Sequence, residues 1–242
     1  MKSPVKLQKK RTGQPAKSTG NRWVEVLYED RDIIVVDKPA GLPTIAPDSS
    51  KTRSLLDIVS QIIQKKNPRG RAALVHRLDR DTSGVIAFAK NPKAKMLLMS
   101  QWRDRADERR YTALVEGIMP DKNGILDSWL DASNPYRVKT VAYGSRNSQR
   151  AISHYLLIKT IGKHSLLELE LKTGRKHQLR VQLAAIGHPI AGDERYGAKT
   201  DPSGRLCLHA SRLVLRSISD NSIITIESPA PDFMNATAQY KH

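Results

Sequence analysis

The densest group of polar side chains in the sequence is the segment 76–84, HRLDRDTSG. It follows the apolar residues 72–75 and precedes the apolar run 85–89, so it is predicted to be a loop between two ordered segments. Loops held in this way often carry functional groups, and its histidine and two aspartates are types used in catalysis. The segment alone leaves open a simpler alternative, a solvated turn in which the aspartates pair with neighbouring arginines.

Metal binding is one chemistry that this loop could support. His76, Asp79 and Asp81 offer three possible ligands within six residues. However, Arg77 and Arg80 lie among them, and their charges oppose a divalent cation. No Cys-x-x-Cys, His-Glu-x-x-His or calcium-loop pattern occurs in the sequence, nor does a Gly-x-x-x-x-Gly-Lys loop for nucleotide phosphates. The residues of this loop therefore give only weak support for metal binding.

A second polar segment, 172–180 with the sequence KTGRKHQLR, joins a strand pattern to a helix pattern. A helix N-terminus attracts anions, and Arg175, Lys176 and His177 at this position would strengthen its attraction for phosphate. Arg180 falls in the first turn of the helix and could instead point at a carboxylate. Taken alone, the segment indicates no more than general affinity for RNA.

The spacing of apolar residues predicts the elements that position these two segments. Ser54 and Asp57 are spaced like a helix-capping box, Asn91 with Pro92 is typical of a helix start, and Gly187 stands where a glycine ends a helix. We expect helices over residues 54–67, 92–107 and 177–186, loops over 39–53 and 120–150, and strands over 24–28, 33–36, 85–89, 111–116, 152–158, 166–171, 206–215 and 223–226. Consecutive strands with few helices between them favour an α+β fold with a mixed, mostly antiparallel sheet flanked by helices and loops.

The charge of the chain indicates the class of its partner. The 242 residues carry 41 Lys and Arg against 24 Asp and Glu, a formal charge of +17. Residues 1–22 hold seven of the basic side chains and no acidic one, so they are expected to form a disordered arm that either contacts RNA or aids solubility. The remaining charge of +10 on residues 23–242 predicts a basic face on the folded part, which favours nucleic acid as the partner.

Other features of the composition narrow the cellular setting. No stretch approaches the roughly 18 apolar residues of a membrane-spanning helix, so a membrane protein is not expected. Cys207 is the single cysteine and cannot form an internal disulfide. The N-terminal basic residues are not followed by the apolar run of a secretory signal. We expect a cytoplasmic protein with one folded domain over residues 23–233 and a short tail over 234–242.

Together, the two polar segments resemble motifs of the RluA-type RNA pseudouridine synthases. Residues 76–84 are similar to the signature loop of that family. Residues 174–180, GRKHQLR, followed by GHPI at 187–190 and GD at 192–193, resemble its later motif. The resemblance spans about residues 23–233, and five motifs in the family's order are not expected to match by chance. The three further matches lie at residues 26–30 with 36–41, at residues 111–117 and at residues 206–210.

This resemblance implies that residues 23–233 form a pseudouridine synthase catalytic domain, an isomerase that uses neither cofactor nor metal. The enzyme would detach uracil from carbon 1′ of a uridine in RNA, turn the base and rejoin it through carbon 5. Asp79 matches the family's essential aspartate, Arg180 the arginine that pairs with it, and Tyr111 the tyrosine of the uracil pocket. The Tyr111 ring is expected to stack on the uracil, while its hydroxyl either assists removal of the carbon-5 proton or belongs to the core.

The same resemblance implies that the target base leaves its stack, and that Arg77 enters the vacated position. We expect a monomer that binds a stem-loop of ribosomal RNA, transfer RNA or both. Two alternatives remain open at this point: a catalytically silent RNA-binding or ribosome-assembly protein on the same fold, and a metal-dependent nuclease. Further contacts to RNA are expected from His76, Arg80, Arg175, Lys176 and His177.

Overall fold

The computed structural model describes residues 24–46, 52–134, 137–229, 231 and 233. None of the helices in these ranges combines the length and the apolar character that a membrane crossing requires. The expected basic arm over residues 1–22 and the tail over residues 234–242 lie outside the described residues, so both stay predictions.

One continuous sheet of eleven strands runs through the described part of the chain, formed by β1 (Glu25–Glu29), β2 (Ile33–Lys38), β3 (Ala73–Leu74), β4 (Ser83–Ala89), β5 (Ala106–Glu116), β6 (Asn123–Asp131), β7 (Lys139–Val141), β8 (Ser148–Ile161), β9 (His164–Leu171), β10 (Leu208–Arg216) and β11 (Ile223–Glu227). Its order is β1-β2-β4-β10-β5-β9-β8-β6-β7, with β11 paired to β10 and β3 paired to β4. Strands β4 and β10 are parallel, and the other named pairs are antiparallel. The predicted α+β fold with a mixed, mostly antiparallel sheet is confirmed.

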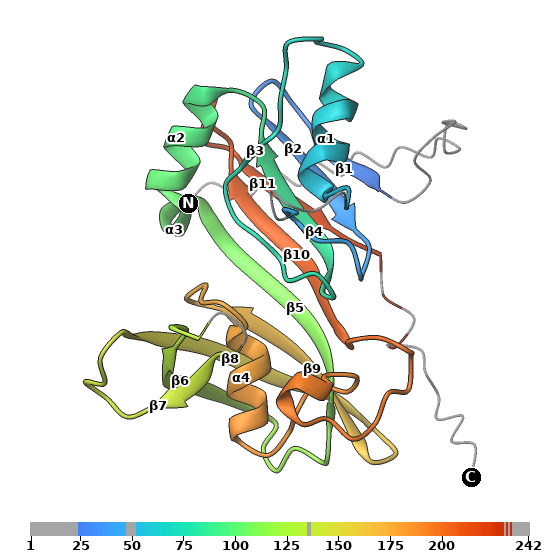
Figure 1. Ribbon diagram of the computed structural model, residues 1–242, viewed down its shortest axis with the longest axis vertical. Coiled ribbons are helices and arrows are strands. Elements are labelled where there is room, and N and C mark those ends of the chain that lie inside the picture. Colours follow the sequence, from blue (N-terminus) through green and yellow to red (C-terminus); the bar gives the residue numbers. More distant parts are fainter. Residues whose placement is uncertain (1–23, 47–51, 135–136, 230, 232, 234–242) are drawn as a thin grey trace, which may run out of the picture.

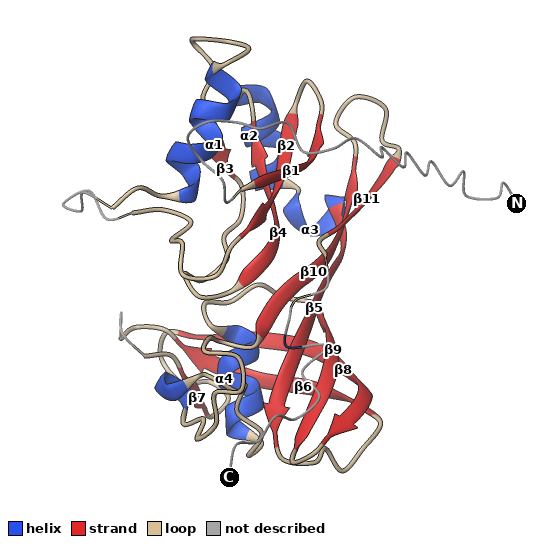
Figure 2. Ribbon diagram, turned by 90° about the vertical axis from the view of Figure 1, so that its right-hand side faces the viewer, coloured by secondary structure: helices blue, strands red, loops and turns tan. Residues whose placement is uncertain are grey.

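The long strands β5 and β10 run through the middle of the molecule and join two halves, as Figures 1 and 2 show. Strands β1 to β4 lie in one half, together with the helices α1 (Leu55–Gln64), α2 (Pro92–Ser100) and α3 (Trp102–Arg105). Strands β6 to β9 lie in the other half with α4 (Gln178–Ala185). The loop that contains Asp79 therefore belongs to one half, and the helix that carries Arg180 belongs to the other.

Two of the three predicted helices form close to their expected limits. Ser54 and Asp57 form the predicted capping box at the start of α1. Helix α4 ends at Ala185, and Gly187 follows with a positive φ, while the amides of Gly187 and His188 donate to the carbonyls of Ala184 and Leu183. These helix ends could be predicted from the sequence because their hydrogen bonds join residues a few positions apart.

The expected helix over residues 92–107 is wrong in its second half. Helix α2 ends at Ser100, α3 adds one short turn, and β5 begins at Ala106. Residues 106–110 pair instead with β10 in register, for example Arg109 with Leu213. This long-range pairing overrides the local helical pattern, as tertiary contacts often do.

The expectation that residues 120–150 form loops is also wrong. Strand β6 lies in this segment and pairs along its whole length with β8, and β7 pairs with the end of β6. Only Leu126 and Leu130 of β6 are buried, so the apolar pattern of this strand is too sparse to be distinguished from a polar loop.

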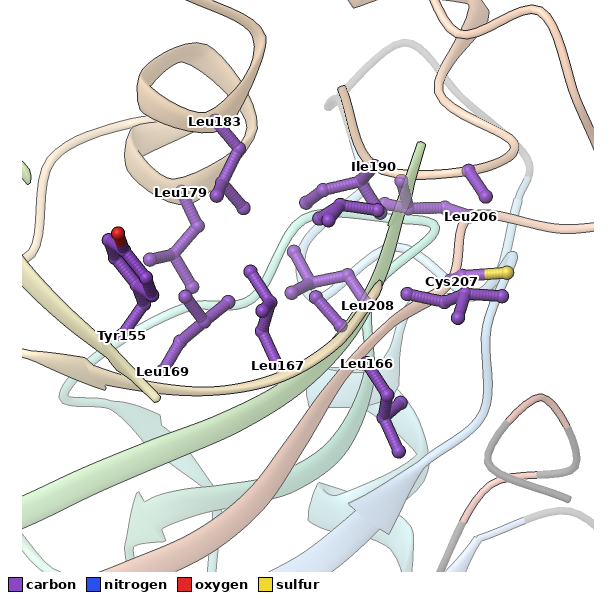
Figure 3. Packing of buried hydrophobic residues seen from close by; sticks show 14 of the residues in the cluster. Tyr155, Leu166, Leu167, Leu169, Leu179, Leu183, Ile190, Leu206, Cys207 and Leu208 are labelled. Atoms are coloured by element: carbon purple, nitrogen blue, oxygen red, sulfur yellow. The ribbon is translucent and has the colours of Figure 1, made fainter. Parts of the chain in front are cut away.

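Helix α4 is seated on the sheet by a cluster of apolar side chains. Leu179 and Leu183 of α4 belong to the same buried cluster as Leu167 and Leu169 of β9, and Figure 3 shows the leucines of the helix above those of the strand. Removing such side chains from water is the main source of stability for a helix of eight residues. The packing fixes the end of the helix that carries the polar segment 172–180.

Gly84 is required where the predicted functional loop enters β4. Its φ is +109°, a value that side chains rarely adopt, and an added Cβ would lie 2.1 Å from the carbonyl oxygen of Ala210. This close approach occurs at the parallel pairing of β4 with β10. Any larger residue here would displace the loop from the middle of the sheet.

Candidate active site

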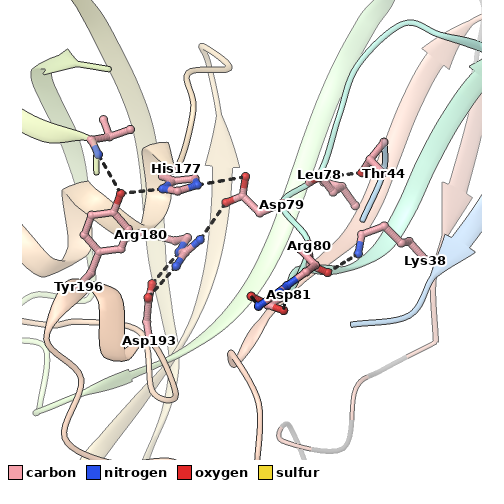
Figure 4. A network of polar contacts seen from close by, with 11 residues as sticks. Lys38, Thr44, Leu78, Asp79, Arg80, Asp81, His177, Arg180, Asp193 and Tyr196 are labelled. Carbon is pink, nitrogen blue, oxygen red and sulfur yellow. Dashed lines mark hydrogen bonds and ion pairs between the residues drawn. The ribbon is translucent and has the colours of Figure 1, made fainter. Parts of the chain in front are cut away.

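The loop that carries Asp79 is held by the last residue of β2 and by the segment that follows this strand. The fully buried Lys38 donates through Nζ to the carbonyl oxygen of Arg80 at 2.7 Å and to two carbonyl oxygens of its own loop. Thr44 donates through its hydroxyl to the carbonyl oxygen of Leu78 at 2.7 Å. The carbonyl groups on both sides of Asp79 are thus fixed, as Figure 4 shows. Burial lowers the pKa of Lys38 to about 7.

The turn before α4 is held in a similar way by one buried amide, that of Gln178. Its Oε1 accepts from the backbone N–H of Arg175 at 2.9 Å and from the Thr173 hydroxyl at 2.8 Å. Its Nε2 donates to the Ile152 carbonyl oxygen at 3.0 Å and to the Ser153 hydroxyl at 2.8 Å, both on β8. These bonds tie the polar segment to the sheet and set the position at which the helix begins.

The two polar segments meet at Asp79 and Arg180, which are 101 positions apart in the sequence. Arg180 donates through Nη1 to Asp79 Oδ2 at 3.2 Å. The same guanidinium donates through Nε and Nη2 to both oxygens of Asp193, at 2.7 and 2.8 Å. Figure 4 shows the guanidinium between the two carboxylates. One cation therefore serves two anions, and the group keeps a net negative charge.

Burial and charge act in opposite directions on Arg180, whose side chain is 8% exposed. Burial alone lowers the pKa of the guanidinium, but the hydrogen bonds to Asp193 and the charges of Asp193 and Asp79 outweigh it and raise the pKa. Arg180 is thus permanently charged. Asp79, with 19% of its side chain exposed, is open to a ligand, whereas Asp193, at 1%, is not.

A cleft of about 700 Å³ opens beside Asp79, and Tyr111 of β5 forms part of its wall. The Tyr111 ring also packs against the apolar clusters of both halves of the molecule. Burial raises the pKa of its hydroxyl to about 12, and the charge of Asp79 adds to the effect. The hydroxyl therefore keeps its proton near neutral pH, so this position offers a ring face and a hydrogen-bond donor.

His76 lines the same cleft, but its ring is engaged by the fold. Its Nε2 accepts the backbone N–H of Ala87 at 2.9 Å, and the ring stacks on Trp102 with a centroid distance of 4.4 Å. Burial and the charge of Arg109 lower the pKa of His76 to about 3. His76 is thus a neutral ring in the wall, and its predicted contact with RNA stays a prediction.

Four other predicted RNA contacts surround the cleft. Arg77 is exposed and lines both this cleft and a second one of about 1200 Å³, and Asp79 also lines both. Arg80 is exposed in the second cleft and forms an ion pair with Asp81 at 3.0 Å. Arg175 and Lys176 line the first cleft. The structure thus brings cationic side chains from both polar segments to the clefts that Asp79 lines.

The sequence assigned no role to three residues that build this site. Lys38 and Asp193 lay within the quoted motifs, at 36–41 and 192–193, while Tyr196 stands in a short 3₁₀ turn, Glu194–Tyr196, that was not predicted. Tyr196 contacts both neighbours of Asp79, since its hydroxyl bonds His177 and its ring lies 5.0 Å from the guanidinium of Arg180. The acidic residue in the GD pair at 192–193 was the available signal for Asp193.

The possible ligands of the metal alternative do not converge. Within the described ranges, no group of three or more His, Cys, Asp or Glu side chains is arranged to hold a metal ion. His76 turns its Nε2 to the amide of Ala87, and Asp81 pairs with Arg80.

The sequence and the fold of this chain have counterparts among known proteins. Residues 32–185, more than half of the chain, match the family described as RNA pseudouridylate synthase. The chain belongs to this family of RNA-modifying isomerases.

Two relatives illustrate the match in sequence. The chain is 35% identical over 222 residues to "Uncharacterized RNA pseudouridine synthase YhcT" of Bacillus subtilis, covering 90% of this chain and 72% of that protein. It is 36% identical over 225 residues to "Ribosomal large subunit pseudouridine synthase D" of Nitrosomonas europaea, covering 89% of this chain and 64% of that protein. The chain thus spans about two thirds of the length of these relatives.

The fold is also found in a solved structure, "Human RNA Pseudouridylate Synthase Domain Containing 4". The two structures superpose with a TM-score of 0.74 at 23% sequence identity, over 87% of this chain and 90% of the human chain. At that identity the likeness concerns the fold.

Proposed function

We propose that this chain converts uridine in ribosomal RNA to pseudouridine and that Asp79 is the carboxylate that reacts. The observation that carries this proposal is the contact of Asp79 with Arg180 at the edge of a cleft, made by two motifs from opposite halves of the molecule. In the reaction the bond from N1 of uracil to carbon 1′ breaks and a bond from carbon 5 to carbon 1′ forms. The carbon-5 proton leaves and N1 gains one.

The position of Asp79 suits a nucleophile or a proton acceptor beside the ribose and the base. A carboxylate covered by an RNA base would lose hydration and tend to take up a proton. The permanently charged Arg180 opposes this, because it donates to Asp79 from a buried position. Tyr111 supports the proposal with a ring face in the cleft on which uracil can stack.

We further propose that the target uridine is flipped out of its stack and that Arg77 fills the space. An enzyme that works on both carbon 1′ and carbon 5 needs the base outside its helix, which costs a few kcal/mol in a stacked region. Arg77 is exposed two positions before Asp79, at the point where the two clefts meet. Its planar guanidinium can stack on bases and contact phosphates.

The names of relatives such as the Nitrosomonas europaea protein support ribosomal RNA as the substrate. The charge of the chain, +17, supports binding to a polyanion. Transfer RNA, action as a monomer, and the cytoplasm as the compartment belong to the same proposal. The domain boundaries at residues 23 and 233 also belong to it.

The test is pseudouridine formation by the purified protein on unmodified large-subunit ribosomal RNA and on transfer RNA. We expect product on ribosomal RNA, none with Asp79→Asn, and unchanged RNA affinity for that variant, because the amide keeps the shape of the carboxylate without its charge. Asp81→Asn is the matched control and should retain product formation.

Three results would contradict the proposal. RNA binding by the wild type without any product would favour the catalytically silent alternative. Cleavage of RNA that is abolished by a chelator would favour the nuclease. Residual activity of Asp79→Asn above a few per cent would remove Asp79 from the chemistry while leaving the synthase activity in place.

A further inference from the structure

A chain of polar contacts approaches Asp79 from the side opposite Lys38. The backbone N–H of Val138 donates to the Tyr196 hydroxyl oxygen at 3.3 Å, and that hydroxyl lies 2.7 Å from His177 Nδ1. The other ring nitrogen, His177 Nε2, lies 3.7 Å from Asp79 Oδ1. Figure 4 shows the imidazole between the hydroxyl and the carboxylate. The sequence suggested contact with RNA for His177, which stays a prediction, and the geometry places its Nε2 toward Asp79.

The hydrogen-bonding capacity of Tyr196 determines which ring nitrogen of His177 carries the proton. The Tyr196 oxygen already accepts the N–H of Val138. If Nδ1 also donated to it, the tyrosine proton would have no acceptor among the described residues, although Tyr196 is only 9% exposed. A buried donor without a partner is costly. The hydroxyl therefore donates to Nδ1, and the proton of neutral His177 resides on Nε2, which faces Asp79.

The backbone of His177 is held in an uncommon conformation that aims the ring. Its φ is +53°, in the left-handed region, and the other non-glycine residues with positive φ in the described chain are both asparagines. Such conformations cost energy and concentrate at functional sites. The side chain of His177 is 7% exposed, which leaves little surface for an RNA contact.

We propose that His177 is a positioning residue for Asp79 and that Tyr196 sets its tautomer. Arg180 donates to Oδ2 of the carboxylate, and the Nε2–H of His177 faces Oδ1, so two donors from α4 and its cap are placed to fix the plane of the reacting group. The distance of 3.7 Å is longer than a hydrogen bond, and this role requires that it shorten when substrate is bound, as catalytic contacts often do. This inference rests on the proposed role of Asp79.

The charges around the ring agree with a neutral imidazole. Burial lowers the pKa of His177, and the positive charges of Arg180, Lys176 and Arg195 lower it further, while Asp79 acts in the opposite direction. A neutral donor orients the carboxylate without adding a second cation. The negative charge that the reaction uses is therefore kept on Asp79.

The first test reads the tautomer directly and needs no activity. The ¹⁵N NMR shifts of the histidine rings are recorded for the full chain, and the His177 signals are assigned by their loss in His177→Asn. Asparagine tolerates positive φ, so this variant keeps the backbone conformation. We expect a proton on Nε2 and none on Nδ1, and a change toward mixed tautomers in Tyr196→Phe but not in the control Tyr143→Phe, whose ring is 83% exposed. A proton on Nδ1, or a doubly protonated ring near neutral pH, would overturn the proposal.

The second test separates positioning from RNA contact. Single-turnover rates and affinities for one stem-loop RNA are measured for His177→Asn, Tyr196→Phe and the double variant. We expect each single variant to lose about ten- to hundredfold in rate, as when a hydrogen bond to a charged group is lost. Affinity should stay within about twofold, and the double variant should be no slower than His177→Asn, because the hydroxyl acts through the imidazole.

Two outcomes of the second test would contradict the positioning role. A fall in affinity that parallels the fall in rate would make His177 an RNA contact. Additive losses in the double variant would show that Tyr196 acts independently of His177.

The wild-type protein separates this inference from the proposed function. The expected tautomer without synthase activity would overturn the proposed function alone, whereas an active wild type with the wrong tautomer would overturn this inference alone.

Discussion

Arg180 is bound more closely to Asp193 than to Asp79. It reaches both oxygens of Asp193 at 2.7 and 2.8 Å, and one oxygen of Asp79 at 3.2 Å. The buried Asp193 thus holds the guanidinium through Nε and Nη2, and an N–H of Nη1 reaches the partly exposed carboxylate of Asp79. The sequence suggested a pair of Asp79 and Arg180, but the structure shows a group of three residues that includes Asp193. A substitution of Arg180 therefore tests its contacts with both carboxylates.

We predict that Arg180→Met destabilises the fold as well as lowering the rate. The substitution leaves Asp193 buried without its cation, which costs about 3 to 5 kcal/mol. The double variant Arg180→Met/Asp193→Asn removes the stranded charge and should recover most of that loss in urea unfolding. Its single-turnover rate should stay as low as that of Arg180→Met.

If the double variant regained activity together with stability, the guanidinium would be needed for the fold alone and its role at Asp79 would be wrong. RNA affinity of the stable double variant is the second readout. A loss of affinity equal to the loss of rate would mean that Arg180 binds a phosphate.

Arg77→Ala should lose more rate on a structured stem-loop than on a short single-stranded RNA that contains the same uridine. Only the stem-loop has a stack in which a gap must be filled after flipping, and Arg77 is the exposed side chain proposed to fill it. Arg69→Ala, at an exposed arginine outside both clefts, is the control for general loss of charge. Equal losses on the two RNAs would count against insertion.

At Tyr111 the ring should matter more than the hydroxyl. Burial raises the pKa of this hydroxyl to about 12, so it is a poor proton acceptor near neutral pH. Tyr111→Phe keeps the ring and should lose less than about tenfold in single-turnover rate. Tyr111→Ala should lose about ten- to hundredfold more, the range expected for a lost stacking contact with a base. A Phe variant as slow as the Ala variant would show that the hydroxyl takes part in the chemistry.

His76 should make the protein less stable in acid. Its pKa is about 3 in the fold against 6.5 in an exposed histidine, so between these values the unfolded chain binds a proton that the folded protein does not. The free energy of unfolding therefore falls as the pH is lowered through this range. His76→Gln retains an acceptor for the Ala87 amide and should reduce the fall between pH 7 and 4.5 by about 2 kcal/mol. Parallel stability curves for the two proteins would contradict this assignment.

Local chemistry made part of the fold predictable. The capping box at Ser54, the helix that begins at Pro92 and the glycine after α4 depend on residues a few positions apart, and the structure shows all three. The prediction failed where distant segments compete. Residues 106–110 pair with β10, and β6 is ordered by its pairing with β8, although the sequence pattern of neither segment indicates a strand.

The candidate site also has a part that the sequence predicted and a part that depends on contacts between distant segments. Residue types and the resemblance to a family were enough to identify 76–84 and 174–180 as the segments that carry the functional groups. The contacts of Asp193 with Arg180 and of Tyr196 with His177 could be found in the folded structure alone. Both contacts depend on where the turn after residue 190 lies against α4. The helix, the sheet and the buried leucines beneath them set that position together, and no spacing along the chain encodes it.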